Sequence, residues 1–317
     1  MKKILFFLCL CWGLTAHAGT ITDADLRQGS TLPIPFKQLK AEARWGASAE
    51  VYTALGKAYY FGWETKKNYK KAYKYFQKAA QKGHPQAQLF SAVMTLKGRG
   101  TPKNPQKAFA SVEQLAQNGS SLAQYILAKM YQNAEGTSKD TAQSIKWLER
   151  SSSAPLPVAA AQYKLALLLE KGVPAQLEKN PQKAFELMLS AAEAEYPLAR
   201  YHTARMYLTG TGTEKNEKKA FKFMKLAAQD GLTRAKTDLS KMYRTGTGVK
   251  ANDWSAFKWM HSAALAGNVP AMETTATYYH QGIGTPANRQ EALFWARQAQ
   301  ENGSSSAKEL IQKIQQD

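Results

Sequence analysis

The side chains best suited to acid–base catalysis or metal binding are spread thinly along this sequence. Histidine changes its charge near neutral pH and is the commonest metal ligand. Beyond the N-terminal segment the chain has His84, His202, His261 and His280. None is paired with a second histidine at i, i+4 or with a carboxylate at ligand spacing. We therefore expect surface or groove histidines and no metal site.

Nucleophiles and phosphate-binding loops are also missing from the pattern. Cysteine occurs only as Cys9 and Cys11, so the rest of the chain has no thiol for a disulfide, a zinc site or a covalent mechanism. No serine lies in a nucleophile elbow, and no two carboxylates have the setting of an acid–base pair. Four glycine pairs resemble phosphate loops but recur at one point of a repeat, as helix stops and tight turns do; they are Gly98 and Gly100, Gly210 and Gly212, Gly246 and Gly248, and Gly282 and Gly284. The sequence predicts no catalytic residue and no cofactor.

Positive charge is the main feature of the composition. The chain has 43 Lys and Arg against 24 Asp and Glu, a formal net charge of +19, in 317 residues of which 44% are hydrophobic. Such a chain is long and apolar enough to bury a core. Its charge favours acidic partners such as nucleic acid, phospholipid, acidic glycan or acidic protein.

Residues 1–18 have the layout of a secretory signal peptide. Lys2 and Lys3 precede an apolar run over residues 4–14, and Ala16-His17-Ala18 is a small-x-small cleavage signal. The run is shorter than the roughly 20 residues that cross a bilayer. We expect cleavage after Ala18, a periplasmic or secreted protein, no stable membrane insertion and no nucleic-acid partner.

The rest of the chain repeats with a period of 36 residues. One register contains Gly83, Gly119, Gly231, Gly267 and Gly303, and a single step of 40 residues interrupts it between Pro155 and Glu195. The register predicts seven units over residues 47–303.

Each unit has the signals of two helices. The first helix has apolar residues at helical spacing, and in six of the seven units it ends in glycine, at Gly62, Gly98, Gly172, Gly210, Gly246 or Gly282. The second helix follows an N-cap residue, which is Asn68, Asn104, Asp140, Asn180, Asn216, Asn252 or Asn288. A helix pair leaves one apolar face half covered until a neighbouring pair stacks on it. We therefore predict an all-α fold, a right-handed α-α superhelix or solenoid.

Both ends of the array are predicted to carry capping helices. Residues 19–46 would form a flexible leader and an N-terminal capping helix with Phe36 and Leu39 facing inward, and residues 304–317 a C-terminal capping helix. Four extra residues between Ser151 and Asn180 have two interpretations. They are a tolerated irregularity, or they divide residues 47–150 from 158–303 into two binding surfaces.

The repeat resembles the Sel1-like repeat of the exported bacterial branch. The segments that carry the resemblance are Leu55-Gly56-Lys57-Ala58-Tyr59, Met206-Tyr207-Leu208-Thr209-Gly210-Thr211-Gly212 and Lys241-Met242-Tyr243-Arg244-Thr245-Gly246-Thr247-Gly248-Val249. The resemblance implies a non-enzymatic scaffold that binds a protein partner, with tasks in envelope assembly, regulation of cell-wall enzymes or contact with host cells.

Cations recur on the first helices at a position nearly opposite the predicted buried side. At 100° per residue these are Lys57, Lys129, Arg205 and Lys241, with Lys97 and Lys171 nearby and Tyr125, Tyr163 and Tyr201 on the adjoining stripe. One hypothesis is a basic concave groove for an acidic protein partner. The alternatives are that the tyrosines pack between repeats and that the lysines are solvated charge.

Two other functions stay open at this point. The basic groove would also suit direct binding of peptidoglycan or another acidic glycan. A hydrolase of β-lactams or cell wall is disfavoured, because the sequence shows no nucleophile constellation.

Overall fold

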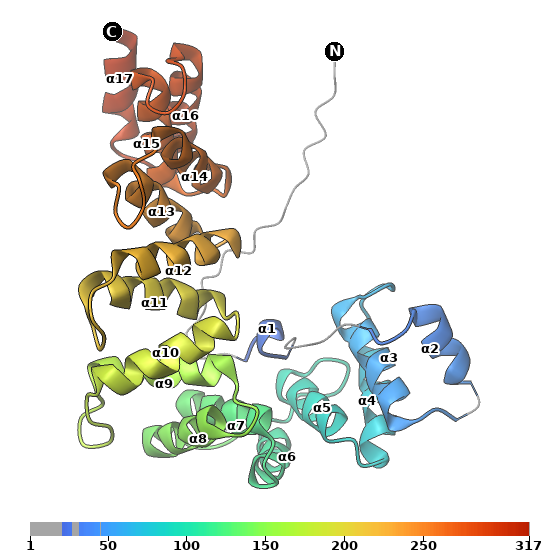
Figure 1. Cartoon of the computed structure of the whole chain (residues 1–317). Helices are drawn as coiled ribbons and strands as arrows, with labels where there is room; N and C mark the ends of the chain where they lie inside the picture. Colours follow the sequence, from blue (N-terminus) through green and yellow to red (C-terminus); the bar gives the residue numbers. More distant parts are fainter. Residues whose placement is uncertain (1–20, 27–31, 45, 317) are drawn as a thin grey trace. The chain divides into compact units, whose positions relative to one another are not determined.

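The computed structural model describes residues 21–26, 32–44 and 46–316, which are mostly helical (Figure 1). Apart from an isolated bridge between Val173 and Leu177, these residues contain no β-structure. Helices α3 to α16 have 13 residues each and follow one another as seven pairs, which confirms the predicted all-α fold of repeated helix pairs.

The bounds are α1 Asp23–Leu26, α2 Phe36–Glu42, α3 Ala49–Phe61, α4 Tyr69–Gln81, α5 Pro85–Lys97, α6 Pro105–Gln117, α7 Ser121–Asn133, α8 Thr141–Ser153, α9 Ala159–Lys171, α10 Pro181–Glu193, α11 Pro197–Thr209, α12 Glu217–Gln229, α13 Thr233–Thr245, α14 Asp253–Leu265, α15 Val269–Gln281, α16 Arg289–Glu301 and α17 Ala307–Gln316. We call the odd-numbered helices from α3 to α15 the first helices, and the even-numbered ones from α4 to α16 the second helices.

The second helix of every pair begins at its predicted N-cap. Asn68 Oδ1 accepts a hydrogen bond from Lys71 N at 2.9 Å, and the other six caps do the same for their helices. A side-chain cap contributes about 1 kcal/mol, because it satisfies an amide that has no partner inside the helix. The start of each second helix is therefore set locally.

Most first helices end at a residue in the left-handed conformation. Gly62, Gly98, Gly210, Gly246 and Gly282 have φ between 66° and 79°. In the third repeat Ala134 takes this conformation, with φ of 57°. Gly172, at the end of α9, has a positive φ but an extended ψ of 161°, so the chain leaves this helix differently.

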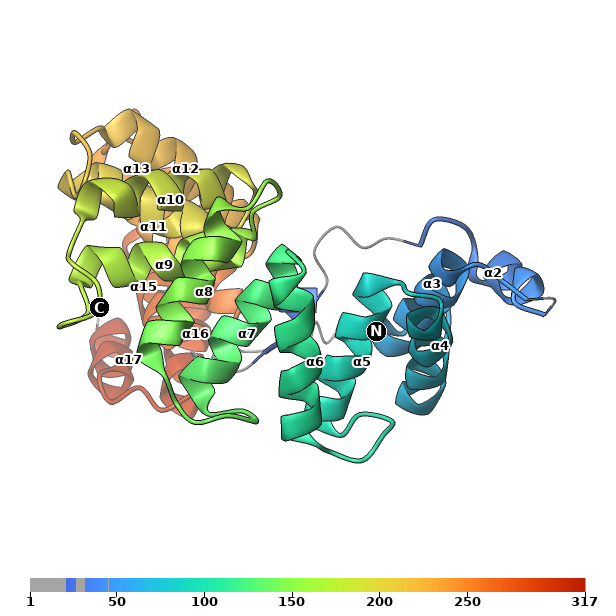
Figure 2. The same cartoon turned by 90° about the horizontal axis from the view of Figure 1, so that it is seen from below.

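The helices form two compact units, one within residues 21–179 and the other within residues 180–316. Within the series α2 to α9, and within the series α10 to α17, consecutive helices pack on each other (Figures 1 and 2). The boundary between the two units lies between residues 179 and 180. The reason is that α9 packs on α8, whereas α10 packs on α11.

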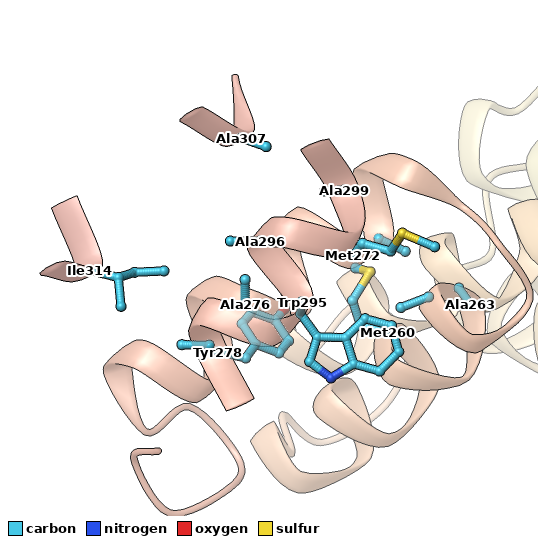
Figure 3. Packing of buried hydrophobic residues seen from close by; sticks show 13 residues of the cluster. Met260, Ala263, Met272, Ala276, Tyr278, Trp295, Ala296, Ala299, Ala307 and Ile314 are labelled. Carbon is cyan, nitrogen blue, oxygen red and sulfur yellow. The ribbon is translucent and has the colours of Figure 1, made fainter. Parts of the chain in front are cut away.

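At the C-terminal end of the second unit, helices α14 to α17 share one apolar core. Figure 3 shows the Trp295 indole in this cluster with Met260 and Tyr278. Ala296 and Ala299 are fully buried, and such small side chains let helices approach closely while the indole fills the space between them. Ile314 of α17, also fully buried, covers the end of this core.

The first unit begins with two short helices. Leu39 of α2 is fully buried, and the Phe36 ring meets the Tyr59 ring edge to face at 5.4 Å. Residues 21–26 differ from the predicted flexible leader. They include α1, and the side chains of Ile21 and Leu26 are only 2% and 1% exposed.

No helix in the described part of the chain is long and apolar enough to cross a membrane. The predicted signal peptide, residues 1–18, lies outside the described residues.

Candidate protein-binding surfaces on the first helices

The nine predicted groove residues belong to both compact units. Tyr201, Arg205 and Lys241 lie within residues 180–316. The other six, which are Lys57, Lys97, Tyr125, Lys129, Tyr163 and Lys171, lie within residues 21–179. Each group is a candidate surface by itself.

In the second unit the predicted residues gather around one carboxylate. Tyr201 Oη donates to Asp238 Oδ2 at 2.9 Å, and Lys241 Nζ lies 3.5 Å from Asp238 Oδ1. The Arg205 guanidinium lies 6.0 Å from the centre of the Tyr201 ring. With the exposed Arg234, these residues form what we call the α11–α13 surface.

The α11–α13 surface has a positive balance of charge. Arg205, Arg234 and Lys241 are exposed, and Asp238 supplies one negative charge among them. Burial, followed by the charge and hydrogen bond of Asp238, raises the pKa of the Tyr201 phenol. Tyr201 is therefore a neutral donor at physiological pH, and the exposed cations can pair with carboxylates from outside the chain.

In the first unit several predicted groove residues are buried, which corrects the prediction for them. Tyr125 is 1% exposed, Tyr163 8% and Lys129 5%, and the Lys129 ammonium lies 5.3 Å from the centre of the Tyr125 ring. Burial lowers the pKa of the half-buried Lys57, whose ammonium lies 5.9 Å from the Phe90 ring centre. Lys171, at the end of α9, is exposed.

The difference between the units follows from how completely each first helix is covered. The helical projection assumed one buried side and one open side. Helix α7 buries every residue from 123 to 130, and α5 every residue from 89 to 96. Helix α13 buries only Ala235, Leu239, Ser240 and Met242. The signal was present in the sequence, because the middle of α5 is apolar around nearly its whole circumference.

The structure also shows a binding feature that the sequence reasoning missed. Lys97, predicted for the open groove, is half-buried and donates from Nζ to the carbonyl oxygen of Ile21. Arg99 Nη1 lies 2.5 Å from Asp23 Oδ1, and Tyr60 Oη donates to the same oxygen at 3.0 Å. Residues 21–23 of the same chain therefore cover the surface around Lys97, Arg99 and Tyr60.

The Asp23 carboxylate is stabilised in its ionised form. Burial opposes its ionisation, but the hydrogen bond and charge of Arg99, together with Tyr60 and Lys97, hold the pKa of Asp23 below its ordinary value. Burial and the Asp23 charge raise the pKa of the Tyr60 phenol. The contact thus joins a carboxylate to a neutral phenol and a guanidinium.

Much of the positive charge lies on second helices rather than in the predicted groove. Two of these helices carry four exposed lysines each, which are Lys70, Lys71, Lys74 and Lys78 on α4 and Lys218, Lys219, Lys222 and Lys225 on α12. We call these groups the second-helix lysine faces. The prediction concentrated on one column and passed over them.

Two of the histidines, His84 and His261, make contacts that stabilise the fold. His84 Nδ1 accepts a hydrogen bond from Ala87 N at 3.3 Å and so caps α5. The His261 ring lies 5.1 Å from the Trp295 ring, and burial lowers the pKa of both imidazoles. Among the residues described, no group of three or more His, Cys, Asp or Glu could hold a metal ion.

Seven helix pairs in two compact units define an α-helical repeat protein, a class whose stacked pairs present extended binding surfaces. The Sel1 repeat matches the chain seven times, at residues 49–84, 85–119, 121–155, 159–196, 197–232, 233–268 and 271–304. The chain therefore belongs to the Sel1 repeat family. Its fold is that of a protein-interaction scaffold, and the family is generally non-catalytic.

Solved structures agree with this assignment. A Sel1 repeat protein from Oxalobacter formigenes is 26% identical with a TM-score of 0.64, and the match covers 84% of this chain and 76% of that chain. A protective antigen present in uropathogenic Escherichia coli strains, which displays an SLR fold, is 22% identical with a TM-score of 0.50, over 89% of this chain and 67% of that chain. Comparison with curated protein sequences gives no match.

Proposed function

We propose that this protein is an exported, non-enzymatic scaffold that binds an acidic segment of a protein partner through the α11–α13 surface. The observation that carries the proposal is the pair of exposed cations on neighbouring first helices, Arg205 and Lys241, beside the half-buried Tyr201. A rigid aromatic ring flanked by cations supplies both apolar contact and carboxylate recognition.

An incoming carboxylate would compete with Asp238 for these donors. The contact between Lys241 and Asp238 is 3.5 Å long, and its lysine is exposed. Surface ion pairs of this kind contribute about 0 to 1 kcal/mol, so Lys241 can exchange its partner at little cost. The Arg205 guanidinium has several N–H donors and makes no ion pair with any carboxylate that the structure describes.

Export is a part of this proposal that depends on the signal-peptide pattern of residues 1–18. It would place the scaffold in the periplasm or outside the cell. Envelope assembly, regulation of cell-wall enzymes and host contact are the tasks that such a location suits.

Reversing two charges tests the binding surface. In the full chain, Arg205→Glu combined with Lys241→Glu is expected to raise the Kd for the partner by tenfold or more, which is about 1.4 kcal/mol. The reason is that both positions then carry negative charge and repel the acidic segment. Helical circular dichroism should stay unchanged, since both side chains are exposed. The partner is first captured from envelope extract on wild-type chain and identified by mass spectrometry, and its Kd is then measured with each variant.

The matched control changes the same charge elsewhere in the unit. Lys222→Glu with Lys225→Glu alters exposed lysines of α12, outside the α11–α13 surface, and should leave the Kd within about threefold, since exposed charges that make no contact with the partner are screened by salt. Equal losses in both variants would mean that net charge alone drives binding. Full retention in both would show that the α11–α13 surface is not the site.

A second candidate function is direct binding of peptidoglycan or another acidic glycan. The second-helix lysine faces favour it, because a row of exposed lysines suits a polyanion without requiring a shaped pocket. Sedimentation with purified cell wall at low and high salt checks this function. It predicts salt-sensitive binding that Lys222→Glu with Lys225→Glu weakens more than Arg205→Glu with Lys241→Glu. The reverse order, or no sedimentation at low salt, would exclude it.

A further inference from the structure

The first unit holds residues 21–26 in the way that a protein holds a bound peptide. The main chain is contacted at the Ile21 carbonyl, which accepts from Lys97 Nζ. The Asp23 carboxylate accepts from Arg99 at 2.5 Å and from Tyr60 at 3.0 Å. Ile21 and Leu26, on either side of it, are buried. Within these six residues, the protein thus contacts a main-chain carbonyl and a carboxylate and buries two apolar side chains.

The two side chains that hold Asp23 depart from the repeat pattern. At the register position of Arg99 the other repeats carry Trp63, Glu135, Val173, Thr211, Thr247 and Ile283. At the position of Tyr60 they carry Leu96, Gln132, Glu170, Leu208, Arg244 and His280. Tyr60 and Arg99 meet on Asp23, and none of the other repeats has this tyrosine–arginine pair at the two positions.

Aromatic rings fix the arginine that recognises the carboxylate. The Arg99 guanidinium lies 5.1 Å from the Tyr69 ring centre and 5.6 Å from the Tyr60 ring centre. Tyr60 in turn packs edge to face on Tyr69 at 5.3 Å and on Phe90 at 5.7 Å. These contacts join α3, α4, α5 and the loop after α5, and none of them is made to residues 21–26. The site is therefore preorganised for a carboxylate, which lowers the cost of binding one.

We propose that Tyr60, Lys97 and Arg99 form a peptide-binding site for protein segments with an aliphatic residue, an aspartate two positions later and a leucine three positions after that. Residues 21–26, Ile-Thr-Asp-Ala-Asp-Leu, occupy this site in the same chain. A partner that carries such a segment binds by displacing them. The site lies in the first unit and the α11–α13 surface in the second, so neither proposal depends on the other.

Because residues 21–26 already occupy the site, a partner's segment has to compete with them. A short tether gives an effective concentration of about 1 mM. A free peptide with the same contacts therefore competes poorly until the segment is released. The site would select partners that make additional contacts, and it would reject weak acidic peptides.

The test uses the full chain and a labelled peptide. Asp23→Lys places a like charge against Arg99 and Lys97 and should release residues 21–26. An end-blocked fluorescent peptide, Ile-Thr-Asp-Ala-Asp-Leu, is titrated against this variant and the wild type, with fluorescence anisotropy as the readout. We expect the released chain to bind the peptide at least about tenfold more tightly than wild type, because the competitor in the same chain is gone.

Two controls tie the binding to the carboxylate contact. Adding Arg99→Ala to the released chain should abolish binding, and so should lysine in place of the first aspartate of the peptide. If Asp23→Lys lowers helical circular dichroism, Asp23→Asn serves as the release variant, with a smaller gain in peptide affinity. The proposal is overturned by equal peptide affinity for wild-type and released chains, by binding that survives Arg99→Ala, or by the absence of binding to the released chain.

Discussion

Replacing Gly248 with alanine is expected to lower the free energy of unfolding of the second unit by about 3 kcal/mol. Gly248 has φ of +70°, and a Cβ there would lie 2.0 Å from the carbonyl oxygen of Glu217 and 2.5 Å from its carbonyl carbon. Both atoms belong to the main chain at the start of α12, so no side-chain rotation relieves the overlap. The loop after α13 would have to move away from the preceding second helix.

The control is a glycine with similar strain and no neighbour. Gly231 has φ of +94°, and a Cβ there meets no atom within 4 Å. Gly231→Ala should therefore cost only the conformational part, about 1 kcal/mol. Urea denaturation followed by circular dichroism compares the two variants. If they lose the same stability, the close approach to Glu217 carries no energy and the interpretation is wrong.

Substitutions at Gly56 and Phe76 are expected to have strongly non-additive effects on the free energy of unfolding. A Cβ at Gly56 would lie 2.5 Å from Cε1 of Phe76. That ring is fully buried and stacked on Phe90 at 4.6 Å, so it has no room to withdraw. Gly56→Ala should therefore cost about 2 kcal/mol. It should do so although alanine is the better helix former.

The sign of this effect should reverse when the ring is removed. Methionine occupies the Phe76 position in three other repeats, as Met188, Met224 and Met260. In a Phe76→Met background, Gly56→Ala should become stabilising by up to about 1 kcal/mol, through helix propensity. A double-mutant cycle in urea measures the coupling. Equal effects of Gly56→Ala in both backgrounds would show that the ring does not explain the glycine.

Helix boundaries were predictable because their causes are local. Asn68 caps α4 through an amide three residues away, and Gly62 ends α3 through its own backbone conformation. The end of α7 carries no such glycine, and Ala134 adopts the left-handed conformation there while its N–H donates to the Met130 carbonyl oxygen. The division at residues 179 and 180 depends on which neighbour each helix packs against, and no residue pattern encodes that choice directly.

The candidate sites were predictable only where a helix keeps an open face. Arg205 and Lys241 are exposed because α11 and α13 bury few residues on that side. Lys129 occupies the same register position but lies on a helix that is covered almost all round. The contact of Asp23 with Arg99 joins residues 76 positions apart, one of them in a stretch without periodicity. Only the folded arrangement brings these two side chains together.

The boundary between the two compact units falls inside one sequence repeat. The fourth Sel1 repeat, residues 159–196, gives α9 to one unit and α10 to the other. Duplication or deletion of any other repeat would lengthen or shorten one unit alone. Gain or loss of the fourth repeat would change both units in a single event, because this repeat supplies the last helix of one unit and the first helix of the other.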